Sequence, residues 1–131
     1  MAYHFTTNLP TEADLFGFYE QLDWNDFLKL PSEQLMKAMQ QSYFSIYVYG
    51  DGQLIAMGRV VSDGVINAYI CGLGVLPDYR GLGIGAAVLK RLNDHCAEQN
   101  LHAQFFCEEH LEEYYERQGF ERFAVGMKHV K

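Results

Sequence analysis

A glycine-rich turn is the segment of this sequence best suited to binding a ligand. An arginine and three glycines at alternate positions form the run Arg80-Gly81-Leu82-Gly83-Ile84-Gly85, and the apolar stripe of a helix begins at its end. Glycines let backbone N–H groups converge on one point, and the start of a helix adds a partial positive charge. We therefore predict an anion site, best suited to phosphate, with Arg80 as a cation at its rim.

Two other phosphate-binding motifs fit this turn less well. A P-loop has Lys and then Ser or Thr after its last glycine, whereas Ala86 follows Gly85 here, so that motif is excluded. A dinucleotide-binding loop shares the glycine spacing, but it lies early in a βαβ unit and has an acidic residue about 20 positions on. This turn lies late in the chain and has Gln104 there, so a dinucleotide binder is kept only as an alternative.

The composition indicates a folded, acidic protein. Its 131 residues are 49% hydrophobic and 21% charged, values typical of globular proteins, and we expect a single domain over residues 1–131. Acidic residues number 17 against 10 Lys and Arg, and the net charge is −7. This balance disfavours nucleic acid as a partner and favours cationic partners.

Targeting and cysteine patterns favour the cytoplasm. No apolar run approaches the roughly 20 residues of a membrane helix, and the first ten residues lack a secretory signal, so we expect no membrane partner. The three cysteines, Cys71, Cys96 and Cys107, form neither a disulfide framework nor a metal-ligand spacing, and the five histidines are scattered. We therefore expect a reducing compartment and no metal site.

Hydrophobic periodicity and turn residues predict the elements that position the glycine turn. Strands are expected at Tyr3–Thr7, Ser45–Tyr49, Leu54–Val61, Val65–Val75 and Leu101–Cys107, with one or two more in Phe120–Val130. Helices are expected after Thr11, from Pro31, past Gly85 and over Leu111–Gln118. The order β-α-α-β-β-β-α-β-α-β indicates an α/β (mixed α+β) fold, in which a mixed sheet lies between helices on both faces.

Two motifs stand in order along the chain. The glycine run at 80–85 follows Val75-Leu76-Pro77, and the run Tyr114-Tyr115-Glu116-Arg117-Gln118-Gly119-Phe120 comes later. The two motifs resemble those of the GNAT superfamily of N-acetyltransferases, whose signature is Arg/Gln-x-x-Gly-x-Gly/Ala after Val-x-Pro. The resemblance covers nearly the whole chain, most securely residues 54–120. It implies a GNAT-like, mostly antiparallel sheet of six to seven strands and an enzyme that moves an acetyl group from acetyl-CoA directly to a primary amine.

The resemblance also implies where acetyl-CoA binds. Backbone amides of the run from Arg80 to Gly85, which includes Gly81, Leu82, Gly83 and Ile84, would hold the diphosphate. The strand residues Leu73, Gly74 and Val75 would pair with the pantetheine amides like an added strand. Glycines at 72 and 74 suit a bulge that opens this slot.

Tyr115 stands where the family often places its general acid, and the resemblance implies that role here. The strand before the turn carries no carboxylate, unlike many small relatives, so Glu108 at the end of the next strand is the candidate base. Trp24 is expected near the acceptor, either shaping the pocket or capping the core.

The acceptor would be a small-molecule or peptide amine, and the acidic surplus favours a cationic one. A homodimer is compatible with an exposed edge strand, and a non-catalytic acyl-CoA-binding or sensor module is the alternative function.

Overall fold

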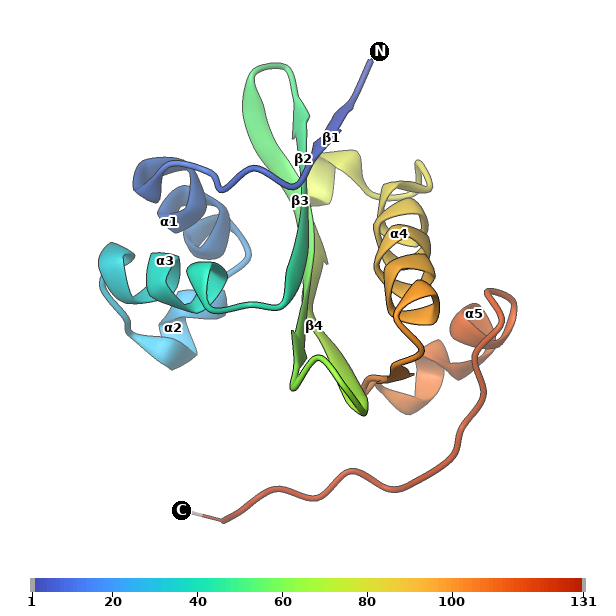
Figure 1. Ribbon diagram of the computed structural model, residues 1–131. Helices are drawn as coiled ribbons and strands as arrows, with labels where there is room; N and C mark the ends of the chain where they lie inside the picture. The colour runs from blue at the N-terminus through green and yellow to red at the C-terminus, as the bar shows by residue number, and fades with distance from the viewer. Residues whose placement is uncertain (1, 131) are drawn as a thin grey trace.

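A five-stranded sheet forms the middle layer of the molecule (Figure 1). Its strands lie side by side in chain order: β1 (His4–Thr6), β2 (Phe44–Gly50), β3 (Gln53–Ser62), β4 (Asn67–Val75) and β5 (His102–Gln104). Neighbours from β1 to β4 are antiparallel, whereas β5 runs parallel to β4. This computed structural model describes residues 2–130.

Helices cover both faces of the sheet (Figure 1). One layer consists of α1 (Glu12–Gln21), α2 (Trp24–Leu28) and α3 (Ser32–Gln40), and the opposite layer of α4 (Ile84–Glu98) and α5 (Glu112–Glu116). Two short 3-10 helices, η1 (Pro77–Tyr79) and η2 (Glu109–Leu111), precede α4 and α5. The prediction of a mixed, mostly antiparallel sheet between helices is therefore confirmed.

Close packing of α4 against the sheet fixes where that helix begins. Gly58 of β3 faces α4, and an added Cβ would come within 2.9 Å of Val88 and 2.8 Å of Leu92. Both side chains are fully buried, and burying a residue of this kind contributes about 1.5–3 kcal/mol. The close contact anchors α4, whose N-terminus belongs to the site described below.

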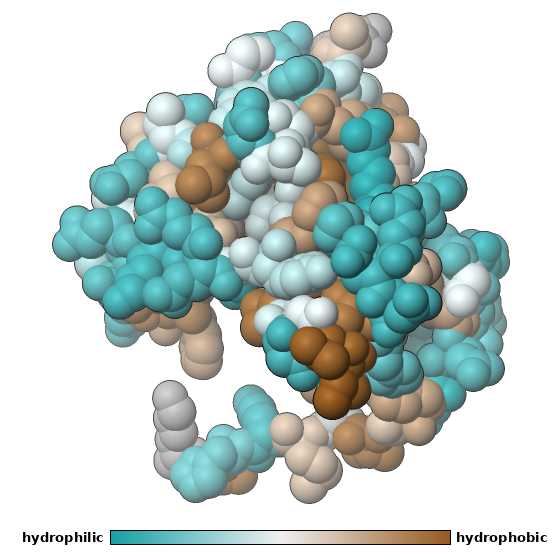
Figure 2. Space-filling view, in the orientation of Figure 1, coloured by the Kyte–Doolittle hydropathy of each residue, from teal (hydrophilic) through white to brown (hydrophobic). Residues whose placement is uncertain are grey.

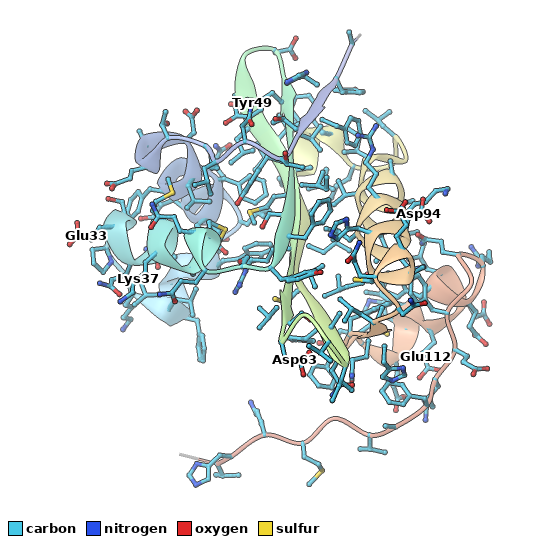
Figure 3. All side chains as sticks on the ribbon, viewed as in Figure 1. Glu33, Lys37, Tyr49, Asp63, Asp94 and Glu112 are labelled. Atoms are coloured by element: carbon cyan, nitrogen blue, oxygen red, sulfur yellow. The ribbon has the colours of Figure 1, made fainter. Side chains whose placement is uncertain are left out.

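Polar side chains cap α1 and hold the turn between β3 and β4. Thr11 Oγ1 accepts a hydrogen bond from the Asp14 N–H at 3.1 Å and so starts α1. At the β3–β4 turn (Figure 3), Asp63 accepts hydrogen bonds from the N–H groups of Val65 and Ile66, each at 2.8 Å. These bonds lower the pKa of the Asp63 carboxyl, so its role is to hold the turn.

The prediction of strands at the C-terminal end was wrong. Within residues 2–130 the sheet has five strands rather than six to seven, because the segment after Phe120 forms none. Every residue from 121 to 130 is exposed, and none hydrogen-bonds through its backbone to the backbone of another described residue. Alternating apolar residues give a segment the propensity for a strand, but a strand forms only against a neighbour that pairs with it.

Two shorter elements also differ from the prediction. The N-terminal layer contains three helices instead of two, because α2 is only five residues long and too short to show a period in the sequence. β5 covers His102–Gln104 instead of Leu101–Cys107, since it pairs only with Asn67–Tyr69 at the start of β4.

Candidate active site

A bulge interrupts β4 next to the glycine turn. Two residues of this strand, Gly72 and Leu73, lie opposite the single residue Gly58 of β3. Gly72 has a φ of +59°, a left-handed conformation that glycine adopts at little cost. The bulge predicted from the two glycines is therefore present, centred on Gly72 and Leu73.

Past the bulge, one edge of β4 has no strand of residues 2–130 beside it. β5 stops at Gln104, opposite Tyr69, so residues 70–75 of β4 extend beyond it. An unpaired strand edge presents N–H and C=O groups that can accept an extended ligand as an added strand. The predicted pantetheine-binding residues 73–75 lie on this free edge.

The glycine turn opens toward the start of α4, which no side chain in the described part of the chain caps. Gly81 and Gly83 have φ of +78° and +81°, and a Cβ added to either residue would meet nothing within 4 Å. Gly83 is the N-cap residue of α4, and the first turn of that helix contains no acidic residue. The first N–H groups of a helix have no partner within it, and the helix dipole adds positive potential. These are the donors that an anion needs.

Two side chains fix the shape of the turn. Arg80 Nε donates to the Val75 carbonyl oxygen at 2.9 Å, which ties the turn to the end of β4. The Tyr79 hydroxyl donates to Asp51 Oδ2 at 2.8 Å, and this bond raises the pKa of Tyr79. Arg80 thus lies at the rim with further N–H groups available for an anion.

A cleft of about 640 Å³ connects the free edge of β4, the glycine turn, the start of α4 and α5. Of the nine residues predicted to bind the cofactor, eight line it: Leu73, Gly74, Val75, Arg80, Gly81, Gly83, Ile84 and Gly85. Leu82 does not, and it is 58% exposed. Residues predicted separately from the strand and from the turn therefore meet in one cavity.

Tyr115 lines the same cleft from α5. Its ring lies edge-on to Phe105 and to Tyr114, with centroids 4.8 and 5.0 Å away. Burial raises the pKa of Tyr115 above its ordinary 10.0, and the neighbouring Tyr114 and Cys107 raise it further. The phenol therefore keeps its proton at neutral pH, as a general acid must.

Trp24 forms part of the cleft wall on the side of α2. Its ring lies over Gly74, so close that an added Cβ would come within 2.6 Å of the indole. Tyr19 and Phe18 of α1 pack edge-on against the indole, with centroids 5.2 and 5.8 Å away. The indole therefore both lines the cleft and packs on the core, the two roles considered from the sequence.

No carboxylate is among the residues that line the cleft in the described part of the chain. The lining side chains that carry a hydroxyl group or a charge are those of Tyr79, Arg80, Tyr114 and Tyr115. Glu108 is exposed, just before η2, and lies outside the lining. The structure thus brings Tyr115 to the cleft but not Glu108.

Arg59 is a residue near the site that the sequence argument missed. Its side chain packs at the bulge, where an added Cβ on Gly72 would lie 3.4 Å from Nε. Arg59 Nη1 donates to Ser42 Oγ at 3.2 Å, and no carboxylate of residues 2–130 forms an ion pair with it. Arg59 is the one charged residue among the residues of β3, and this isolated charge was the signal in the sequence.

Comparison with known proteins agrees with this architecture. The sequence matches the model of the acetyltransferase (GNAT) family over residues 8–120. It is 26% identical to GCN5-related N-acetyltransferase 2, chloroplastic, of Arabidopsis thaliana, and 28% identical to histone acetyltransferase TAP1 of Glycine max. These alignments cover 88% and 89% of this chain but 52% and 56% of the relatives, so the chain spans about half of their length.

A solved structure shows the same fold. Glucosamine-6-phosphate N-acetyltransferase from Arabidopsis thaliana is 17% identical, and its TM-score is 0.79 over 99% of both chains. The fold is therefore the one seen in that acetyltransferase. Since the family model covers residues 8–120, the chain belongs to the acetyltransferase (GNAT) family, and the resemblance seen in the sequence is confirmed.

Proposed function

We propose that this chain is an acetyl-CoA-dependent N-acetyltransferase, built as one domain over residues 1–131, that transfers an acetyl group directly to a primary amine. One observation carries the proposal: the uncapped start of α4, the free edge of β4 and the protonated Tyr115 face a single cleft. Membership of the family supports the type of reaction.

The charge and the free backbone groups of the cleft support CoA as its ligand. The N–H groups at the start of α4, together with Arg80, offer donors to a diphosphate, and no acid in the first helical turn opposes it. Residues 73–75 offer backbone groups to the pantetheine amides along the free edge of β4. When bound, acetyl-CoA supplies the acetyl group as a reactive thioester.

Two groups of the chain act on the reacting atoms in this proposal. A backbone N–H of β4, that of Leu73 at the bulge or of Val75 beyond it, donates to the carbonyl oxygen on which negative charge develops. Tyr115 holds a proton on Oη and gives it to the departing sulfur, whose conjugate acid has a pKa of about 8.5. The raised pKa of Tyr115 keeps that proton in place, although it makes the transfer more uphill.

We propose Glu108 as the base for the amine. An amine resembling lysine has a pKa of about 10.4 and must lose a proton before it attacks. Because Glu108 lies outside the cleft lining, a water would carry the proton between the two groups. Glu108→Gln should then lower kcat about 100-fold, whereas an unchanged kcat would remove Glu108 from the mechanism.

A cationic small molecule or peptide is the acceptor that the charge distribution favours. Four of the 17 acidic residues lie in the short segment that leads to Tyr115: Glu108, Glu109, Glu112 and Glu113. Such a cluster raises the local concentration of a positively charged amine. A cytoplasmic location stays a prediction, since one relative is named as chloroplastic. No helix in residues 2–130 has the length and apolar character to span a membrane.

The alternative is an acyl-CoA-binding module without catalysis. It is favoured by the absence of a carboxylate among the described residues that line the cleft. Calorimetry with CoA, together with thiol release from acetyl-CoA over a panel of primary amines, separates the two functions. The enzyme should bind CoA saturably and release thiol only when an amine is present. Saturable binding with no turnover would favour the module, and thermal protection by NAD without any by CoA would favour a dinucleotide binder.

A further inference from the structure

Arg59 is the only Asp, Glu, Lys or Arg residue in the five strands of residues 2–130. Figure 2 shows hydrophilic residues over both helical layers, with a paler and more apolar band between them. Arg59 lies on the side of the α1–α3 layer, because its Nη1 donates to Ser42 just after α3 and its neighbour Gly58 faces α4. A charge between a helical layer and a sheet is costly unless it has a partner.

The groups around Arg59 are neutral. Burial raises the pKa values of Tyr19, Tyr47, Tyr69 and Cys71, and the positive charge of Arg59 lowers each of them by less. All four groups therefore keep their protons at pH 7 and offer no negative charge. The Nε atom of Arg59 is buried without a hydrogen-bond partner among the described residues. A buried donor in this state is rare, which indicates that the partner of this cation comes from outside the chain.

This cation adjoins the cleft at the bulge of β4. Arg59 pairs with Cys71 across the two strands, and Leu73, two residues further along β4, lines the cleft. Two strand residues span about 7 Å. Gly72 lies between them and has no side chain, and an added Cβ would lie 3.4 Å from Arg59 Nε. Since Arg59 is only partly buried, a solute can reach part of its side chain from this side.

The charge of Arg59 suits an oxyanion other than the diphosphate of CoA. Guanidinium groups bind carboxylates and phosphates through charge-assisted hydrogen bonds, and the bond to Ser42 Oγ at 3.2 Å holds this one in place. The donors proposed for the diphosphate lie past Val75, at the start of α4, whereas Arg59 lies at the other end of the bulged stretch. Arg59 is therefore placed to bind the second substrate.

We propose that Arg59 binds an oxyanion of the acceptor, so that the acceptor is a primary amine that also carries a carboxylate or a phosphate. This inference rests on the proposed N-acetyltransferase function and names its substrate class. The oxyanion pairs with Arg59 and so orients the amine toward the thioester carbonyl beside Leu73. A molecule with two amines and one carboxylate, such as lysine, still has the net positive charge that the acidic surplus favours.

Initial rates with matched pairs of amines test the proposal. Lysine is compared with cadaverine, and phosphoethanolamine with ethanolamine, because the second member of each pair lacks only the oxyanion. In at least one pair the wild type should prefer the oxyanion-bearing amine at least tenfold in kcat/KM. Arg59→Gln should remove this preference and leave rates with cadaverine and ethanolamine unchanged. No preference in either pair, or an equal loss with all four amines, would overturn the proposal.

Arg91→Gln is the matched control for the loss of a positive charge. Arg91 lies on α4, with its guanidinium 4.1 Å from the centroid of the Phe5 ring and outside the cleft lining. This variant should keep the preference of the wild type, and its loss would show that net charge, not Arg59, selects the acceptor. Arg59→Lys keeps the charge and should retain part of the preference, whereas a purely structural Arg59 would affect all four amines alike. Circular dichroism establishes that each variant is folded.

A binding measurement separates this inference from the proposed function. NMR of the labelled wild type with CoA, which carries no acetyl group, follows the Arg59 Nε–H signal during titration with each amine. The signal should move with the oxyanion-bearing member of the preferred pair and not with its partner. A signal that stays fixed with millimolar lysine and phosphoethanolamine would overturn the inference.

The two failures give different results. Turnover of all four amines with equal efficiency would refute the oxyanion site and leave the acetyltransferase function standing. A moving Arg59 signal without turnover of any amine would refute the acetyltransferase function and leave the oxyanion site standing.

Discussion

Tyr115 acquires its chemical character from its neighbours rather than from its motif alone. The aromatic rings of Phe105 and Tyr114 pack against it, and its partial burial raises the pKa of its phenol. A neutral phenol beside the free edge of β4 can donate a proton but cannot act as a base near pH 7. The motif predicts which tyrosine lies at the site. Packing around that tyrosine favours the protonated form of its hydroxyl.

Replacement of Tyr115 by Phe should lower kcat about 100-fold and leave CoA affinity nearly unchanged, because only the proton donor is lost. The sign of the pKa shift adds a second expectation. An acid whose pKa is raised keeps its proton to higher pH, so any alkaline limb due to Tyr115 should lie above pH 10.0. Steady-state rates as a function of pH and calorimetry with CoA measure both.

Tyr43→Phe serves as the control for the loss of a phenol, because Tyr43 lies outside the cleft and packs beside His95. It should behave as the wild type. Equal rates for Tyr115→Phe and the wild type, or an alkaline limb below pH 10 that only Tyr115→Phe abolishes, would contradict the proposed role.

At the scale of elements, the position of α2 against the bulged strand β4 depends on the close contact between Trp24 and Gly74. The Trp24 indole occupies the space where a Cβ of Gly74 would stand. Gly74→Ala should therefore displace Trp24, destabilise the fold by about 1–3 kcal/mol through overpacking and weaken CoA binding along β4. Urea unfolding and calorimetry with CoA measure the two effects.

Gly17→Ala is the matched control for that substitution. Gly17 lies within α1, and a Cβ there would meet nothing within 4 Å. Alanine should stabilise the helix by about 0.5–1 kcal/mol. If Gly74→Ala proved as stable as the wild type and bound CoA equally well, the contact with Trp24 would not shape the cleft.

The elements also show which parts of the molecule local sequence determines. The glycine turn, the bulge at Gly72 and the cap at Thr11 were predictable, because the residues themselves restrict the backbone. The contribution of Trp24 to the cleft and the exclusion of Glu108 from it arise from tertiary packing, which no local spacing encodes. The segment after Phe120 has strand propensity, yet the neighbour that would complete it is not given by its own residues.

At the scale of the whole molecule, the negative field should act differently on the two substrates. A net charge of −7 attracts a cationic amine and repels anionic acetyl-CoA, and salt screens both effects as the Debye length falls from about 30 Å at 0.01 M to about 8 Å at 0.15 M. Between these ionic strengths, the KM of a doubly charged primary amine should rise several-fold at constant kcat, while the KM of acetyl-CoA does not rise. Initial rates with each substrate varied in turn measure both KM values, and a rise confined to the amine distinguishes screening from general inhibition by salt. An amine KM that is insensitive to salt would show that the acidic surplus does not select the acceptor.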